Sequence, residues 1–278
     1  MKLNFTKMHG IGNDYIYFNC LDSELENPSE TAIKLSPRHT SVGADGIVMI
    51  CKSDVADAKM RMFNADGSEG KMCGNAIRCV GKYLYDRGIT NKTELKIETL
   101  SGIKILSLSV KDGTVESVRV DMGYADFSPK AVNLDSDDEY IDRELEVDGK
   151  IYKITALSVG NPHAVVYVDD PDVLDLEKLG PKFENHPLFK DKVNTEFVQK
   201  ISDTELKMRV WERGSGETYA CGTGACATVA SSVKNGLVKA GAPITVSLIG
   251  GKLTIECTPD YKIFMTGSAE FVYDGTTL

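Results

Sequence analysis

The chain has 278 residues, a formal net charge of −9 at pH 7, and 42% hydrophobic and 26% charged residues. These values are ordinary for a soluble globular protein, and the length is sufficient for two domains. No apolar run approaches the roughly 20 residues of a membrane-spanning helix, and the N-terminal residues lack the core of a signal peptide. The acidic balance, without any Lys/Arg cluster, argues against nucleic acid, so we expect neither a membrane nor a nucleic-acid partner.

Short strands are predicted along most of the chain, because β-branched or alternating apolar residues recur in brief runs. In the first half these are residues 3–5, 15–19, 46–51, 59–63, 94–99, 103–110 and 116–121. In the second half they are residues 151–159, 164–168, 195–200, 205–211, 244–248, 252–258 and 262–266.

Each half also contains one good helical stretch, residues 74–86 and residues 222–234, with apolar or small residues at helical spacing. Both are followed by a glycine, Gly88 and Gly236, which is a helix stop signal. Shorter helices are predicted at residues 30–35 and 172–179, and the acidic stretch 136–146 is expected to connect the halves. The predicted fold is α+β, with a mixed sheet curled around a central helix, made twice, and a ligand site in the cleft between the two domains.

The two halves repeat one another at an offset of 148 residues, from Lys59-Met60-Arg61 to Lys207-Met208-Arg209. The further matches are Gly12-Asn13 with Gly160-Asn161, Phe63 with Trp211, Glu69 with Glu217, Cys73-Gly74 with Cys221-Gly222, Leu100 with Leu248, and Gly102 with Gly250. A single offset held over such a length indicates one domain copied once, because solenoid repeats are far shorter.

Cys73 and Cys221 each precede a glycine at the start of a predicted helix. The first-turn amides and the helix dipole stabilise a thiolate, which predicts a lowered thiol pKa, and the same amides form a carboxylate site. Two such turns facing one substrate would remove a proton from one face of a carbon and return it on the other without a cofactor. The other five cysteines, Cys20, Cys51, Cys79, Cys226 and Cys257, are predicted to be packing residues.

The seven cysteines form an odd set without a Cys-x-x-Cys pair. This favours free thiols in a reducing cytoplasm over a disulfide framework, and gives no close ligand spacing for zinc. We therefore expect a cytoplasmic protein with no bound metal.

The segments GSEGKMCGNAIRC and ERGSGETYACGTGACA make the chain resemble the diaminopimelate epimerase family, whose members are cofactor-independent amino-acid epimerases. The resemblance runs from Lys7-Met8-His9-Gly10 nearly to the C-terminus. It implies interconversion of LL- and meso-diaminopimelate in lysine biosynthesis, no cofactor, and a homodimer. It also implies a first domain of residues 1–121, to which a last strand at 266–278 returns, and a second domain of residues 122–265.

The same resemblance implies roles for individual residues. Cys73 and Cys221 would be the two bases, and His163 and Glu212 would tune the thiols. The reacting carboxylate would lie on the helix starts, at Gly74, Asn75, Gly222 and Thr223. The remaining substrate contacts would be Asn13, Asn64, Asn161, Asn194, Glu212 and Arg213. A glycine, Gly46, stands where the family often has a glutamine, so only a main-chain contact could remain there.

Independently of the family, Arg213 suits a carboxylate because its guanidinium binds two oxygens at once, although a surface salt bridge is the alternative. The asparagines suit a zwitterion because each amide both donates and accepts, although any one could be a turn residue. His163 is equally compatible with core packing. Glu69 and Glu217 are repeat-equivalent but receive no catalytic role.

Three rival functions remain open from sequence. The first is another racemase of the same fold, acting on proline or hydroxyproline, although proline offers no distal carboxylate for Arg213. The second is a thiol redox protein using Cys73 and Cys221, which a dithiol redox titration would reveal. The third is a non-catalytic amino-acid binding module, which would not need two thiols.

Overall fold

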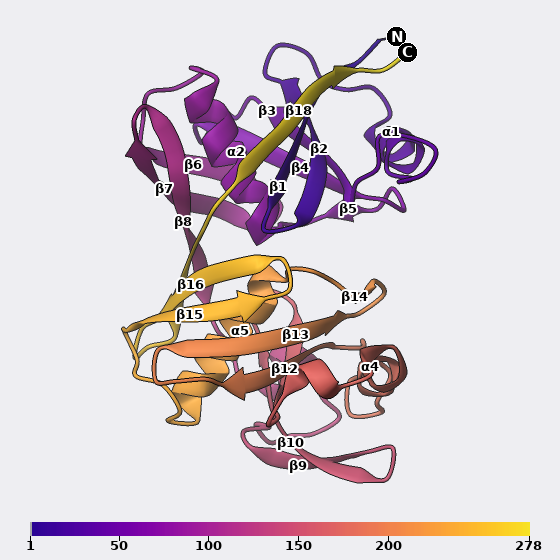
Figure 1. The fold of residues 1–278 in the computed structure, drawn as a ribbon, viewed down its shortest axis with the longest axis vertical. Helices are drawn as coiled ribbons and strands as arrows, with labels where there is room; N and C mark the ends of the chain where they lie inside the picture. The colour runs from indigo at the N-terminus through magenta and orange to yellow at the C-terminus, as the bar shows by residue number, and fades with distance from the viewer. Residues whose placement is uncertain (1) are drawn as a thin grey trace. The chain divides into compact units, whose positions relative to one another are not determined.

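In the computed structural model, which describes residues 2–278, the chain divides into two compact units. The first unit runs to Asp121 and takes up the chain again at Thr266–Leu278, whereas the second is Met122–Met265. Figure 1 colours the first unit from indigo to purple, with its returning C-terminal strand in yellow, and the second from rose to gold. None of the helices in the described part of the chain is long and apolar enough to cross a membrane.

In the first unit, one group of strands precedes a single long helix in the chain and a second group follows it. Its elements are β1 Asn4–Gly10, β2 Asn13–Cys20, α1 Pro28–Leu35, β3 Gly46–Cys51, β4 Ala58–Asn64, β5 Glu69–Gly70, α2 Gly74–Asp86, β6 Glu94–Thr99, β7 Gly102–Lys111, β8 Thr114–Tyr124 and β18 Glu270–Thr276.

The second unit repeats this order. Its elements are α3 Pro129–Val132, β9 Arg143–Val147, β10 Lys150–Ser158, β11 Pro162–Tyr167, the 3-10 helix η1 Pro171–Val173, α4 Leu176–Glu184, β12 Asn194–Lys200, β13 Glu205–Glu212, β14 Gly216–Glu217, α5 Gly222–Lys234, β15 Pro243–Leu248, β16 Gly251–Cys257 and β17 Lys262–Gly267.

The strand pairings confirm the duplicated α+β fold. In the first unit β1 pairs antiparallel with β2, β2 parallel with β3, β3 antiparallel with β4, and β4 parallel with β6. In the second unit β10, β11, β12, β13 and β15 pair in the same order and directions. The parallel pairs need crossover connections, and α1 and α4 supply the equivalent crossovers, from β2 to β3 and from β11 to β12.

In each unit one further strand pairs with the first strand of this order, and the two units take that strand from different parts of the chain. In the first unit β18 pairs antiparallel with β1, and Figure 1 shows the yellow β18 beside the indigo β1. In the second unit β9 pairs antiparallel with β10. The expectation that residues 136–146 merely connect the halves was therefore wrong, because Arg143–Val147 forms the second unit's counterpart of β18.

The repeat offset of 148 holds through both long helices, which begin at Gly74 and Gly222, and then increases by one. The hairpin that pairs Thr99 with Gly102 corresponds to the one that pairs Leu248 with Gly251. The sequence match of Gly102 with Gly250 was thus one residue short. The extra residue lies between the end of α5 and β15.

Each long helix is the centre of its unit. The described side chains of α5 are buried from Gly224 to Ser232, and those of α2 are buried up to Leu84. A helix buried on all sides must be surrounded by other elements, and strands supply that cover. Small residues let the strands approach α5 closely: a Cβ on Gly224 would lie 2.7 Å from a carboxylate oxygen of β12.

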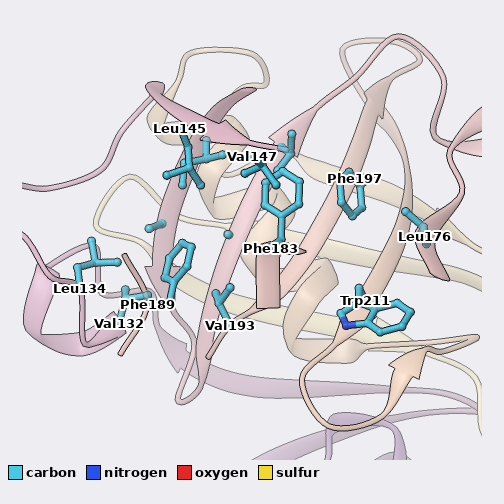
Figure 2. Close-up of a cluster of buried hydrophobic side chains, with 14 residues drawn as sticks. Val132, Leu134, Leu145, Val147, Leu176, Phe183, Phe189, Val193, Phe197 and Trp211 are labelled. Atoms are coloured by element: carbon cyan, nitrogen blue, oxygen red, sulfur yellow. The ribbon is translucent and has the colours of Figure 1, made fainter. Parts of the chain in front are cut away.

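In the second unit, a cluster of apolar side chains packs between α4 and the sheet, on the face away from α5 (Figure 2). There Phe183 of α4 packs edge-on against Phe197 of β12 and Tyr152 of β10. Trp211 of β13 lies in the same cluster, and its indole nitrogen donates to Glu184 at 2.8 Å. This layer anchors the strands that carry the candidate site residues of the second unit.

Candidate active site

Cys73 is the N-cap of α2, and its sulfur accepts a hydrogen bond from the Ala76 amide at 3.5 Å. An N-cap side chain normally uses oxygen to satisfy a first-turn amide, so here a thiol takes that place. Gly74 and Asn75 form the first positions of the helix and are buried, whereas Cys73 is partly exposed. The sulfur of Cys73 and the start of α2 are therefore held together by this hydrogen bond.

Asn13, at the start of β2, lies directly beside this thiol, with its Oδ1 3.4 Å from Cys73 Sγ. Its Nδ2 donates to Asp45 at 2.7 Å, and the same carboxylate oxygen accepts the Asp14 amide. Arg38 bonds both Asp14 and Asp45. Because a carboxylate can only accept, Asp45 fixes the Asn13 amide so that its carbonyl faces the sulfur.

Asn64 ends β4 and pairs in the sheet with Gly46 of β3. Its Nδ2 donates to Ser68 at 3.0 Å, so the side chain is already oriented by its own turn. A Cβ on Gly46 would lie 2.1 Å from the Phe63 carbonyl oxygen. Position 46 therefore has no room for a side chain in this strand pairing, and a main-chain contact to the substrate remains a prediction.

Cys221 caps α5 in the same way, and its sulfur accepts the Gly224 amide at 3.3 Å and lies 3.5 Å from the Thr223 hydroxyl. The amides of Gly222 and Thr223 come earlier in the turn and have no acceptor within the helix. Such free first-turn amides are the groups to which anions bind at helix starts. Cys221 differs from Cys73 in being buried, with 4% of its surface exposed.

The thiol pKa of Cys221 is raised well above its usual value, mainly by burial and then by the charges of Glu212 and Glu196. The lowering that the sequence predicted for this residue was therefore wrong. A helix start stabilises a thiolate by a modest amount, and here two carboxylates and the loss of water outweigh it. Burial also raises the pKa of Glu212, against the hydrogen bond from Thr218 and the charge of His163.

His163 is fully buried in β11, between two partners. Its Nδ1 lies 2.7 Å from Glu196 and its Nε2 lies 3.0 Å from the Asn161 amide oxygen. Asn161 is the repeat equivalent of Asn13, and the two amides now have different neighbours, an imidazole and a thiol. Its two polar partners fix the orientation of the imidazole ring, and the full burial of His163 is compatible with both the core role and the functional role that the sequence left open.

Arg213 lies just after β13, where its main-chain amide donates to Asn194 Oδ1 at 2.9 Å. Its guanidinium donates to the Asp191 carbonyl at 2.9 Å and has no carboxylate within 4.0 Å among residues 2–278. The alternative of a surface salt bridge is therefore not seen for this arginine. Glu184 accepts the next amide, of Gly214, and so anchors the loop.

The structure thus places the sequence-predicted residues in two groups. In the first unit Cys73, Gly74, Asn75 and Asn13 lie together, and Asn64 lies at the end of a neighbouring strand. In the second unit one hydrogen-bonded and charge-coupled group contains Cys221, Gly222, Thr223, Glu212, His163 and Asn161. Asn194 joins Arg213 beside this group.

Glu69 and Glu217 have a structural contact instead. Each accepts from the arginine of the Lys-Met-Arg strand, Arg61 at 2.8 Å and Arg209 at 2.7 Å. The other five cysteines are all buried. In the part of the chain that the structure describes, no group of three His, Cys, Asp or Glu side chains is arranged to hold a metal ion.

The sequence did not single out three residues that orient this site. Asp45 and Arg38 fix Asn13, and Glu196 holds His163. Glu196 could have been found from the sequence. It is a carboxylate in the middle of an otherwise buried strand, at a position where the first half of the repeat has Val48.

The two-domain fold with one cysteine-capped helix in each unit is compared first with solved structures. Among solved structures, a hydroxyproline epimerase from Agrobacterium vitis matches with a TM-score of 0.74 at 16% identity, covering 99% of this chain and 92% of that one. A PhzF-family phenazine biosynthesis protein from Bacillus anthracis also matches at 0.74, with 19% identity and coverage of 100% and 99%. These structures share the two-domain fold.

Sequence comparison narrows the class to one family. The chain is 56% identical to the diaminopimelate epimerase of Acetivibrio thermocellus and 50% identical to that of Methanococcus maripaludis. Each match spans 275 residues, with 98% of this chain and 98% and 99% of the relatives covered. The family's sequence profile matches residues 5–128 and 155–272. The chain therefore belongs to the diaminopimelate epimerase family.

The raised pKa of Glu212 gives a stability prediction. The carboxyl ionises less readily in the folded protein than its usual value of 4.5. Its stabilising contribution is therefore complete below that value and is lost as the pH rises through the folded pKa. We expect Glu212→Gln to match the wild type near pH 4 and to exceed it in free energy of unfolding at pH 8, measured by urea unfolding.

Glu217→Gln is the matched control, because its carboxylate is paired with Arg209 and should not gain stability when neutralised. A wild type and Glu212→Gln variant with the same pH dependence of unfolding would contradict the burial of an ionisable carboxyl at this position.

Proposed function

We propose that the chain interconverts the LL and meso isomers of 2,6-diaminopimelate, a step of lysine biosynthesis, with Cys73 and Cys221 as its two bases. The observation that carries the proposal is the sulfur-capped helix start, which occurs once in each unit of a member of this family. Its relatives at 50% identity and above are named for this activity.

In the proposed reaction, both sulfurs serve one substrate α-carbon. One cysteine, as thiolate, takes the α-proton and becomes a thiol, while the bonding electrons remain on the substrate as a carbanion. The other cysteine, as thiol, then gives its proton to the opposite face and becomes a thiolate. The configuration inverts, and the two cysteines exchange protonation states, which solvent exchange must restore before the next turnover in the same direction.

The helix starts supply the electrostatic part of this reaction. The amides at Gly74 and Asn75 and at Gly222 and Thr223 are the groups that we propose for the substrate α-carboxylate. Negative charge that spreads onto this carboxylate as the proton leaves is stabilised by fixed donors, which is how acyl and enolate transition states are commonly stabilised. No cofactor is needed in the proposed reaction.

The distal end of the substrate carries a second amino-acid group. Arg213 suits its carboxylate, because the guanidinium is oriented by Asp191 and has no carboxylate partner among residues 2–278. Asn64 and Asn194, together with Asn13 and Asn161, are the proposed amide contacts to the zwitterion. A site that hydrogen-bonds a polar group rejects substrates lacking it far more strongly than an apolar pocket does.

The setting of the enzyme is also part of the proposal. The seven reduced cysteines suit a cytoplasmic enzyme. A homodimer is proposed from the family resemblance, and β18 offers exposed Val272 and Tyr273 that such an interface could cover. Neither nucleic acid nor membrane is proposed as a partner, in view of the net charge of −9. Light scattering of the purified protein would test the dimer.

The activity is tested by incubating LL-diaminopimelate with the purified protein and following the meso isomer by chiral chromatography. We expect Cys73→Ala and Cys221→Ala each to lower kcat by a factor of about 10³ or more, because each removes a group that must carry a proton in the transition state. Cys226→Ala, in the same helix as Cys221 but away from its start, should keep nearly wild-type turnover. Wild-type turnover by Cys221→Ala would contradict the two-base assignment.

Arg213 should matter for binding more than for proton transfer. A contact to the distal carboxylate persists in the ground state and the transition state, so its loss raises KM more than it lowers kcat. We expect Arg213→Met to show that pattern in steady-state kinetics. Arg143→Met, which removes an arginine paired with Asp138 on the same unit, is the control and should leave KM unchanged. A large fall in kcat at constant KM would instead place Arg213 at the reacting carbon.

A further inference from the structure

Glu196 is a buried carboxylate that the reaction described above does not use. It lies in β12, and its side chain has no exposed surface. One oxygen lies 2.7 Å from His163 Nδ1, whereas the other, also buried, has no hydrogen-bond partner in the part of the chain described. A buried charge with half of its acceptor capacity unused is costly, so its presence calls for a reason beyond packing.

The position of this carboxylate relative to the second thiol is fixed by Gly224. A Cβ on Gly224 would lie 2.7 Å from Glu196 Oε1 and 3.2 Å from Cys221 Sγ. The carboxylate and the sulfur therefore both lie against the space that a side chain on Gly224 would occupy, in the first turn of α5. A larger residue at position 224 would separate them.

Glu196 acts on Cys221 together with groups from the two neighbouring strands. His163 comes from β11 and Glu212 from β13, on either side of β12. Both carboxylates disfavour the thiolate of Cys221, and His163 offsets the charge of Glu212. The sulfur is thus surrounded by ionisable groups from three strands.

The first unit shows what the same frame looks like without them. Sheet register pairs Val48 with Met62 and Glu196 with Val210, so Val48 is the equivalent of Glu196. By the same offset of 148, Tyr15 stands in place of His163, and Asn64 in place of Glu212. Each of the three groups around Cys221 therefore has a repeat equivalent in the first unit that carries no formal charge. The duplication provides two equal frames and only one of them carries these charges.

We propose that Glu196 is a positioning residue for the proton chemistry of Cys221: it holds a proton on His163 Nδ1 and keeps a negative charge behind the second thiol, so that Cys221 rests in the protonated form. A carboxylate can only accept, so its contact with Nδ1 requires a hydrogen on that ring nitrogen. The Nε2 atom lies 3.0 Å from the amide oxygen of Asn161, which belongs to the proposed substrate contacts.

This inference rests on the proposed function for its meaning, because a resting thiol is the form that donates a proton to the substrate carbanion. The tests below need no turnover. They can therefore fail while the epimerase assay succeeds, or succeed while that assay fails.

The ring contact is tested by ¹⁵N NMR of protein labelled at histidine. The chain contains four histidines, so the spectrum is simple, and His163 is assigned by the signal that His163→Asn removes. We expect the wild type to show His163 protonated at Nδ1. In Glu196→Val, which installs the residue of the first half and replaces a buried charge by an apolar group, this preference should be lost. The same Nδ1–H form in both proteins would overturn the proposal.

The charge on the thiol is tested by measuring alkylation of Cys221 and Cys73 by iodoacetamide across a pH series, with peptide mapping by mass spectrometry. Removing a nearby negative charge favours the thiolate. Glu196→Gln should therefore shift the Cys221 profile to lower pH and increase its rate severalfold at a fixed pH below the midpoint, while the Cys73 profile stays in place.

Glu217→Gln is the matched control, since it neutralises a carboxylate of the same unit that is bound to Arg209, and both profiles should stay unchanged. If Glu196→Gln does not fold, Glu196→Val is measured in the same way and carries the same expectation. An unmoved Cys221 profile, or one moved to higher pH, would overturn the assigned role of Glu196, even if turnover also fell.

Discussion

At the start of each central helix, a cysteine sulfur accepts a hydrogen bond from a main-chain amide. The candidate site residues of each unit are arranged around that contact. The sulfur of Cys73 lies 3.5 Å from the Ala76 nitrogen and that of Cys221 lies 3.3 Å from the Gly224 nitrogen. Because the cap is itself the proposed base, the proton acceptor cannot move away from the amides that would hold the substrate carboxylate. The curled sheets serve to bury these helices and keep their first turns rigid.

The duplicated frame does not make the two thiols equivalent. In the first unit the sulfur faces the Asn13 carbonyl, which Asp45 orients from behind. In the second unit the sulfur is buried near two carboxylates, and an imidazole takes the place of the thiol beside Asn161. A reaction that takes a proton on one face and delivers another on the opposite face needs one thiolate and one thiol at a time, so different surroundings for the two sulfurs suit its chemistry.

The sequence predicted what is repeated and local. The two helices, Gly74–Asp86 and Gly222–Lys234, were predicted to the residue, because apolar spacing and the following glycines mark both ends. The duplicated α+β fold followed from the offset. Pairings between distant segments were not visible in local patterns, as for β9 beside β10, and the return of β18 to β1 was expected only from the family resemblance. The pKa of Cys221 was predicted in the wrong direction, because burial and carboxylates on other strands oppose the helix start, and neither can be read from the motif itself. Glu196 escaped notice because its signal, a carboxylate where the repeat has Val48, lies outside the cysteine motifs.

The central claim is that two different residues handle the proton, and hydrogen isotope exchange during the first turnovers tests it most directly. LL-diaminopimelate is incubated with the enzyme in heavy water, and both isomers are analysed by mass spectrometry at low conversion. With two bases, the abstracted proton stays on one sulfur while the product receives its hydrogen from the other, which has equilibrated with solvent. We expect deuterium in the meso product from its first appearance and almost none in the remaining LL pool. Deuterium entering the unreacted LL pool as fast as the product would contradict the account.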